Sequence, residues 1–249
     1  MYQTQSRKGS RCPFIPRPGN PTEAPSLILK VSDVQWLPDN NRIALTLLGY
    51  AEFCNGSWRG GTSDILSLTP PSLGTSPLAQ YATRPSINRN GQVLFDSFDL
   101  SRPRNRADGI WELDLGAQPP SETHLIAHSA DRSPVWAPDG RRFAVVRVTT
   151  SPSAYVSERT YAIMLYDRQN LNNPRMLLFA DHGYSVSSLS WSPDGAYLVY
   201  TLYQNGGGDI WWLDVSTGAT GPITTDGQAR DVAWRPVSVS RVFLPLVVR

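Results

Sequence analysis

The sequence predicts an all-β fold: a β-propeller of about five four-stranded antiparallel blades. Three observations carry this prediction. A Trp-centred motif recurs along the chain, a short alternating strand follows most copies, and the composition is rich in turn residues. The 249 residues include 19 Gly and 21 Pro, which favour many turns over long helices. A repeat of roughly 40–50 residues is typical of propeller blades.

Each copy of the motif ends in a tight turn. Two copies are nearly identical, Ser133–Gly140 and Ser188–Gly195, and both close with Trp, a small residue and Pro-Asp-Gly. The remaining copies, in chain order, are Asp33–Asn40, the weaker Arg84–Gly91 and the truncated Asp231–Pro236. Pro fixes φ at the first corner, Asp bonds its own backbone, and Gly or Asn tolerates positive φ. The motif therefore predicts a hairpin between the first two strands of each blade.

The anchor residues of the repeat are separated by 51, 49, 55 and 43 residues; they are Trp36, Ile87, Trp136, Trp191 and Trp234. Second strands are expected at Ile43–Leu47, Val93–Phe95, Phe143–Val146 and Tyr197–Tyr200. Third strands are expected at Asp64–Leu68, Gly109–Asp114, Ala162–Asp167 and Asp209–Asp214. Short fourth strands are expected at His124–Ile126, Met176–Leu178 and Ile223–Thr224. A lone blade would expose two apolar faces, so neighbouring blades must stack.

Most large aromatic residues of the repeat are interpreted as structural. The tryptophans expected in the core between blades are Trp36, Trp111, Trp136, Trp191, Trp211 and Trp234. Asp114, Asp167 and Asp214 end the third strands, so we expect their side chains to cap the turns that follow. Carboxylates at equivalent repeat positions are not an acid–base pair.

The last repeat predicts a first strand at Val232–Trp234 and a second at Val242–Leu244. Leu27–Leu29 precedes Trp36 at the spacing of a fourth strand, so we expect it to complete the last blade and join the termini. A six-bladed ring, an incomplete ring, a fragment of a larger ring or pairing with another subunit are the alternatives. The five prolines within residues 1–25 predict an extended tail or linker, which leaves residues 26–249 as the propeller domain.

The composition excludes some classes of partner. A net charge of +2 argues against nucleic acid, which needs a concentrated basic face. No apolar run approaches the roughly 18 residues of a membrane span, and the first 25 residues lack the apolar core of a signal peptide. Cys12 and Cys54 form no C-x-x-C pair; one disulfide between them and two unrelated thiols are the alternatives.

The motifs of common enzymes are not found. Gly183–Ser187 lacks the final Gly of a G-x-S-x-G nucleophile turn, and Gly206–Gly208 precedes a strand rather than a phosphate-binding helix. His124, His128 and His182 lack metal-ligand spacing. We therefore expect neither a cofactor nor a metal, and a binding scaffold rather than an enzyme. A propeller lyase or hydrolase with scattered channel residues is the catalytic alternative.

Partner-binding residues are expected on one face of the propeller. The loops between second and third strands are long and individual, at 49–63, 98–107, 149–160 and 204–208. The Trp, Tyr and Arg residues on them, of the types enriched at binding hot spots, are Trp58, Arg59, Arg102, Arg104, Arg106, Tyr155, Arg159 and Tyr203. The alternative is a set of solvated loops whose aromatic side chains pack on their own blades.

A second candidate site is the mouth of the central channel. Arg132 and Arg230 lie four positions before their anchors, on strands expected to be innermost. Together they could hold a carboxylate through paired hydrogen bonds. The alternative pairs them with Asp131, Asp226 or Asp231.

The Trp-Ser-Pro-Asp-Gly turn at Trp191–Gly195, followed by the Ile-Trp-x-Leu-Asp strand at Ile210–Asp214, resembles the TolB-type propeller repeat, a WD-repeat-like family. The resemblance covers about residues 26–249; it departs at Ile87, which replaces the anchor Trp, and after Pro236, where no Asp-Gly follows. It implies a module that binds a protein or peptide, in the cell envelope and outside the cytoplasm, either periplasmic or secreted. TolB-type propellers also resemble the domain that covers prolyl-oligopeptidase-type serine peptidases. The alternative binder is a carbohydrate-binding propeller that uses Trp58 and the loop tyrosines.

Overall fold

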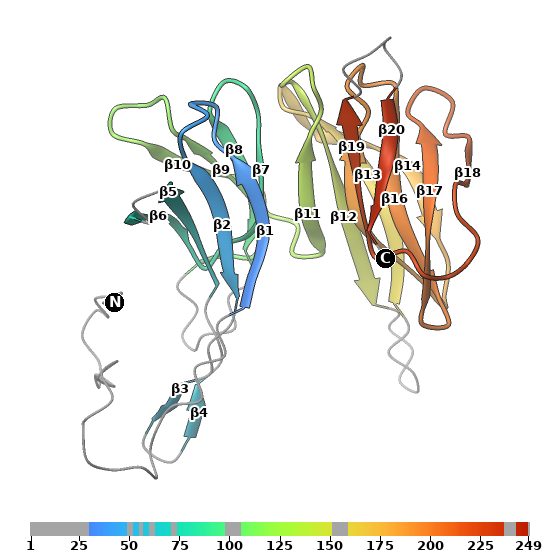
Figure 1. Cartoon of the computed structure of the whole chain (residues 1–249), viewed down its shortest axis with the longest axis horizontal. Coiled ribbons are helices and arrows are strands. Elements are labelled where there is room, and N and C mark those ends of the chain that lie inside the picture. The colour runs from blue at the N-terminus through green and yellow to red at the C-terminus, as the bar shows by residue number, and fades with distance from the viewer. Residues whose placement is uncertain are drawn as a thin grey trace.

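The computed structural model describes residues 30–48, 52–54, 57–59, 63–70, 74–97, 106–150, 159–236 and 243–248. The elements assigned in these ranges are all strands, which confirms the all-β prediction. Four four-stranded antiparallel sheets follow one another along the chain in a propeller arrangement, and a two-stranded sheet comes last. Figure 1 shows the first two sheets on the left and the third and fourth on the right. The count of five complete blades stays a prediction.

Each of the four sheets is an up-and-down blade. The first contains β1 (Lys30–Trp36), β2 (Ile43–Leu48), β5 (Asp64–Thr69) and β6 (Gly74–Gln80). The second contains β7 (Thr83–Ile87), β8 (Gln92–Ser97), β9 (Gly109–Asp114) and β10 (Ser121–Ile126). The third contains β11 (Asp131–Trp136), β12 (Arg142–Thr150), β13 (Arg159–Asp167) and β14 (Asn170–Ala180). The fourth contains β15 (Tyr184–Trp191), β16 (Tyr197–Gln204), β17 (Gly207–Asp214) and β18 (Thr220–Pro222).

Two further pairs of strands complete the described elements. β19 (Asp231–Pro236) pairs with β20 (Phe243–Val248) and forms the fifth sheet. β3 (Glu52–Cys54) and β4 (Ser57–Arg59) form a separate hairpin inside the loop between β2 and β5. Figure 1 shows this hairpin projecting from the lower face of the molecule, toward which β12 also points at its end. The second strands of the sheets end on this face, where the long loops are predicted, and we call it the long-loop face.

The apolar core lies between the sheets. In β8, Val93 and Phe95 belong to a buried cluster shared with the first sheet, while Leu94 belongs to one shared with the third. A third cluster joins the third and fourth sheets, and a fourth joins β16 and β17 to Val232 of β19. The central strands are therefore buried on both faces, and each fully buried large apolar side chain contributes about 1.5–3 kcal/mol. No sheet could hide these faces alone, which is the physical reason for the propeller arrangement.

The Pro-Asp-Gly turns form as the sequence predicts. Asp139 Oδ1 accepts hydrogen bonds from the backbone N–H groups of Arg141 and Arg142, at 2.8 and 2.9 Å. Gly140 and Gly195 have φ of 66° and 71°, a region that side chains disfavour. The caps after the third strands are confirmed as well: Asp114, Asp167 and Asp214 each accept a hydrogen bond from the backbone N–H two residues further on.

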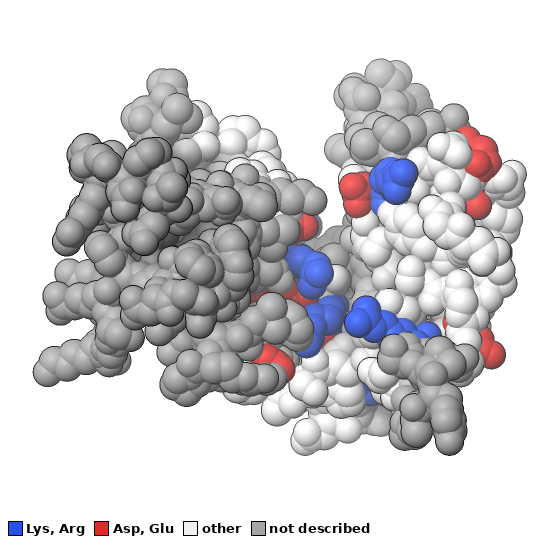
Figure 2. Space-filling model, turned by 90° about the horizontal axis from the view of Figure 1, so that it is seen from below, with Lys and Arg blue, Asp and Glu red and all other residues white. Residues whose placement is uncertain are grey.

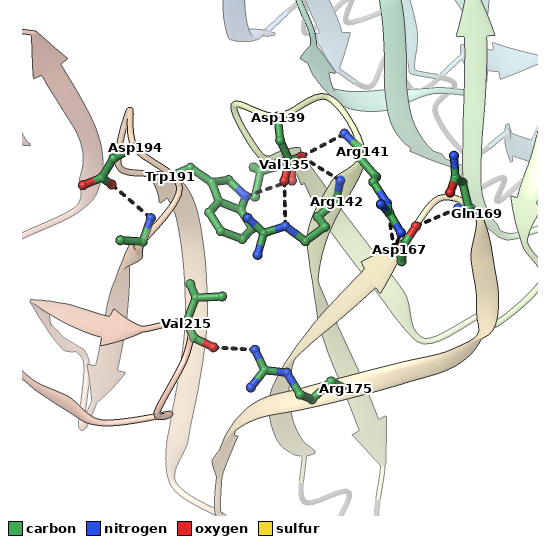
Figure 3. A network of polar contacts seen from close by, with 11 residues as sticks. Val135, Asp139, Arg141, Arg142, Asp167, Gln169, Arg175, Trp191, Asp194 and Val215 are labelled. Atoms are coloured by element: carbon green, nitrogen blue, oxygen red, sulfur yellow. Dashed lines mark hydrogen bonds and ion pairs between the residues drawn. The ribbon is translucent and has the colours of Figure 1, made fainter.

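Figure 3 shows the contacts around these turns. Arg141 pairs with Asp167 at 2.7 Å, and Arg142 pairs with Asp139 at 2.7 Å while lying 5.8 Å from the ring centre of Trp191. The hydrogen bond from Arg141 lowers the pKa of the Asp167 carboxyl. The carboxylates of Asp139 and Asp167 thus contact groups of their own blade, which agrees with the interpretation of Asp167 as structural.

Some details of the prediction were wrong. The fourth strand of the fourth sheet is Thr220–Pro222 rather than Ile223–Thr224, and Ile223 instead donates its N–H to Ile210 O at 2.7 Å. β6 and the β3–β4 hairpin were missed. Trp36 was expected in the core, but it is 57% exposed, whereas Trp136 and Trp191 are each 7% exposed. The residues Leu27–Leu29 and Cys12 lie outside the described residues.

Candidate binding site at the channel mouth

A central cavity of about 1880 Å³ runs along the first strands of the five sheets. Its wall is drawn from β1, β7, β11, β15 and β19, with the ends of β12 and β13 at one side. Figure 2 views the molecule from the long-loop face and shows basic side chains gathered around the hollow. The cavity corresponds to the predicted channel.

A bulge recurs in the wall of this channel. Asp33, Arg84, Ser133 and Ser188 each lie three residues before their anchor and have φ of 50°, 53°, 52° and 52°. The pairing register of the first two strands shifts at each of these positions. A left-handed conformation costs a residue other than Gly roughly 1–2 kcal/mol, so neighbouring contacts must hold it. Such outliers cluster at functional sites, and here all four line the cavity.

The buried carboxylate of Asp96 holds two of these bulges. It is fully buried and accepts hydrogen bonds from Thr83 Oγ1, from Arg84 Nη1 at 2.6 Å and from the Ser133 backbone N–H at 2.8 Å. The carboxylate raises the pKa of the Arg84 guanidinium, so that side chain stays charged and paired. Asp96 on β8 thus ties the second sheet to the third at the channel wall. This role of Asp96 was missed in the sequence, because the residue follows an apolar run in a predicted second strand.

A second buried carboxylate, Asp131, lies at the start of β11. Its oxygens accept hydrogen bonds from Arg147 at 2.6 and 3.0 Å and from the Tyr166 hydroxyl at 2.7 Å. Burial, with the hydrogen bond to Asp131, raises the pKa of Tyr166. Arg132 donates from Nη1 to the Asp131 carbonyl oxygen at 2.9 Å, and it lines the cavity.

The predicted binding residues fall into distinct places. Arg132 and Arg159 both line the cavity, and Arg159 is exposed at the start of β13. Arg230 is exposed but is not part of the cavity wall; its carbonyl oxygen accepts a hydrogen bond from the Tyr203 hydroxyl at 2.8 Å. The structure therefore brings Arg132 together with Arg159 at the channel, and not with Arg230.

Arg106 is engaged on its own blade. Its Nη2 lies 2.7 Å from Glu122 Oε2, and its guanidinium lies 4.6 Å from the ring centre of Trp111 and 5.1 Å from that of Phe95. The side chain is 11% exposed. Trp58 and Arg59 belong to β4, of which only the backbone is described. The other predicted loop residues, Arg102, Arg104 and Tyr155, lie outside the described residues.

In the part of the chain that the structure describes, no group of three or more His, Cys, Asp or Glu side chains is placed to hold a metal ion. Within the same residues, no helix has the length and apolar character needed to cross a bilayer.

The chemistry that the channel wall offers is hydrogen bonding to a ligand. The wall presents guanidinium groups, hydroxyls and bulged backbone.

Comparison with known proteins supports a TolB-like propeller. No protein-family model matches the chain. The Tol-Pal system protein TolB of Francisella tularensis subsp. tularensis is 30% identical over 83 residues, which are 33% of this chain and 18% of that protein. The crystal structure of TolB from Acinetobacter baumannii superposes with a TM-score of 0.57 at 18% identity, over 83% of this chain and 46% of that one.

The propeller is also similar to parts of larger enzymes. Acylaminoacyl peptidase of Pyrococcus horikoshii gives a TM-score of 0.54 at 16% identity, over 80% of this chain and 32% of the peptidase. This chain therefore matches less than a fifth of the length of the TolB relative and a third of the peptidase. The comparisons confirm the predicted resemblance to TolB-type propellers, and at these identities the solved structures show the fold alone.

Proposed function

We propose that the chain is a non-catalytic scaffold that binds a protein or peptide segment at the channel mouth on its long-loop face. The observation that carries the proposal is the cavity of about 1880 Å³, whose wall combines Arg132 and Arg159 with bulged polar positions from successive sheets. Arginine is enriched at binding hot spots, and its planar guanidinium group donates hydrogen bonds well to carboxylates and backbone oxygens. A TolB-like propeller in an envelope complex outside the cytoplasm fits this role, since the similar protein TolB is named for the Tol-Pal system.

The non-catalytic part of the proposal is supported by two carboxylates buried behind the channel wall. Asp96 and Asp131 are fully buried, and each is held by hydrogen bonds to at least two side chains. Such engaged carboxylates position neighbouring groups rather than transfer protons to a ligand. The likeness to a peptidase concerns only a third of that enzyme.

We also infer that β19 and β20 begin a fifth blade, which Leu27–Leu29 completes. The support comes from Trp36. Its counterparts Trp136 and Trp191 are covered by the preceding sheet, whereas Trp36, Val34 and Val31 on β1 are 57%, 64% and 53% exposed. A completed last blade would cover this apolar face and close the wall of the channel.

The binding proposal is tested by selecting peptides from a display library on the immobilised full chain. Dissociation constants of the selected peptides are then measured for the Arg132→Ala, Arg159→Ala double variant. The matched control is Arg42→Ala, Arg141→Ala, which removes two exposed arginines from the tight turns of the opposite face. We expect at least about a tenfold loss of affinity for the channel variant and little change for the control. Equal affinities of the two variants would reject the channel mouth as the site.

A further inference from the structure

A second cavity lies between the third and fourth sheets, away from the channel. It has a volume of about 480 Å³, within the range of small-ligand sites. The end of β14 forms one wall, and β16, β17 and their connections form the other. Its aromatic lining residues are Phe179, Tyr184, Tyr200 and Trp211. Among the described residues that line it, Asp181 and Asp209 carry negative charge and none carries positive charge.

The second sheet shows what fills the equivalent space there. Phe95, Trp111 and His124 lie opposite one another on neighbouring strands, and the rings of Trp111 and His124 stack with centres 4.4 Å apart. The guanidinium of Arg106 lies over both Phe95 and Trp111, and its charge is paired with Glu122. A flat cation thus covers this aromatic row.

The fourth sheet keeps two aromatic residues of this row but lacks the third ring and the covering cation. Tyr200, Trp211 and Pro222 occupy the positions of Phe95, Trp111 and His124 in the strand pairing. Gly206 stands five residues before Trp211, where the second sheet has Arg106 five residues before Trp111. Gly206 and Pro222 thus stand where the second sheet has the flat side chains of Arg106 and His124. The open cavity adjoins this row of the fourth sheet.

Hydrogen bonds hold polar side chains of the cavity in place. Asp209 Oδ1 accepts hydrogen bonds from the Thr224 hydroxyl and the Gly227 N–H, both at 3.0 Å, which fix its carboxylate. The Gln204 amide donates to the Tyr184 hydroxyl at 2.9 Å. Within the described residues, the indole N–H of Trp211 makes no hydrogen bond, unlike that of Trp111, which donates to Ala107 O at 3.1 Å.

We propose that this inter-blade cavity is a second binding site and that it takes the guanidinium group of an arginine side chain from a bound peptide. Aromatic faces attract a flat cation through their π-systems, and a fixed carboxylate adds a charge-assisted hydrogen bond. The partner supplies in trans what Arg106 supplies within the second sheet. This site is independent of the channel mouth.

The test uses the full chain labelled with ¹⁵N and follows the indole N–H signals of its 8 tryptophans by NMR. Trp211→Phe assigns the signal of Trp211. The probes are N-acetyl-arginine amide, its neutral counterpart N-acetyl-citrulline amide, and methyl glucoside. We expect the Trp211 signal to shift with the arginine probe and to respond much less to the citrulline probe.

Two variants locate the site without removing the indole. Asp209→Asn keeps the oxygen that binds Thr224 and Gly227 but loses the charge, so the arginine probe should bind at least about tenfold more weakly. Pro222→His restores the imidazole of the second sheet and should also weaken binding. Glu122→Gln, which removes one charge from the second sheet, is the control and should bind normally.

Three results would overturn the proposal: a response to methyl glucoside without one to arginine, equal responses to arginine and citrulline, or unchanged binding in Asp209→Asn. The two proposals can fail separately. If the Arg132→Ala, Arg159→Ala variant bound the selected peptides as tightly as wild type while the Trp211 signal still responded to arginine, the channel-mouth proposal would be rejected and this one would stand.

Discussion

Trp191 of β15 donates its indole N–H to the carbonyl oxygen of Val135 on β11, at 3.1 Å. The same bond recurs one blade further on, from Trp234 to Ser190 at 3.2 Å, and Trp136 reaches Gln92 O at 3.2 Å. Each of these three tryptophans thereby fastens its sheet to the preceding one. Ile87 has no indole. Its backbone N–H instead donates a hydrogen bond to Gln35 Oε1 of the first sheet, at 3.0 Å.

The anchor bond predicts a large effect of truncating Trp191. Trp191→Ala should lower the free energy of unfolding by about 3–5 kcal/mol, because it removes a buried indole and its hydrogen bond. Met176→Ala, at a side chain that is 57% exposed, serves as the control and should change stability by less than about 1 kcal/mol. Urea unfolding followed by circular dichroism measures both. Similar losses in the two variants would contradict the fastening role.

Closure of the last blade predicts an effect of the N-terminal segment. Deleting residues 1–29 should lower the melting temperature markedly, whereas deleting residues 1–23, which keeps Leu27–Leu29, should leave it nearly unchanged. The physical reason is that the apolar face around Trp36 would lose its cover. Differential scanning calorimetry compares the two deletions. Identical melting temperatures would reject closure by this segment.

Gly109 at the start of β9 should tolerate no side chain. Its φ is 128°, and an added Cβ would lie 2.0 Å from the carbonyl oxygen of Ile126. Gly109→Ala should therefore cost about 3 kcal/mol, from backbone strain together with overpacking. The control is Gly183→Ala, where φ is 86° but no atom lies within 4 Å, so only the conformational cost of about 1–2 kcal/mol applies. Chemical denaturation of both variants separates the two contributions.

The turn residue Asp194 predicts a loss of stability in acid. Hydrogen bonds from the Ser192 hydroxyl and the Ala196 N–H lower the pKa of its carboxyl below the ordinary 3.8. A group whose folded pKa is depressed stabilises the protein above its unfolded pKa, and this contribution disappears as the pH falls through the folded pKa. Asp194→Asn should reduce stability at pH 7 by about 1 kcal/mol and flatten the decline below pH of about 4. Urea midpoints between pH 2.5 and 7, relative to wild type, check this; parallel curves would refute it.

Tyr166 predicts the opposite behaviour in alkali. Burial and the Asp131 carboxylate raise its pKa above the ordinary 10.0. The unfolded chain then loses the phenolic proton first, so stability falls as the pH rises above 10.0 toward the folded pKa. Tyr166→Phe should remove this part of the decline and cost about 1–2 kcal/mol at pH 7 through the lost hydrogen bonds to Asp131 and Arg147. An alkaline decline as steep as in wild type would show that Tyr166 contributes nothing to it.

The repeat made most of the framework predictable. The Trp-x-Pro-Asp-Gly motif predicted the turns at Asp139 and Asp194 because Pro, Asp and Gly each favour one position of such a turn. The channel wall was less predictable, because its bulges are occupied by Asp, Arg and Ser rather than by Gly. Two of these bulges make hydrogen bonds to another sheet, such as the bond from Ser133 to Asp96, 37 residues apart, which no local sequence pattern reveals. Arg132 was predicted from its position four residues before the anchor and Arg159 from its residue type on a long loop. Only the fold shows that they share one cavity.

The bulges also bear on how such a molecule could acquire new ligands. The same bulged backbone recurs in four sheets, and the side chains on it, at Asp33, Arg84, Ser133 and Ser188, are already of three different kinds. Charge and size at the axis can thus drift while the surrounding architecture stays intact. A combinatorial library randomised at Asp33 and Ser188, the two positions that do not touch Asp96, would be a starting point for selecting receptors with new preferences.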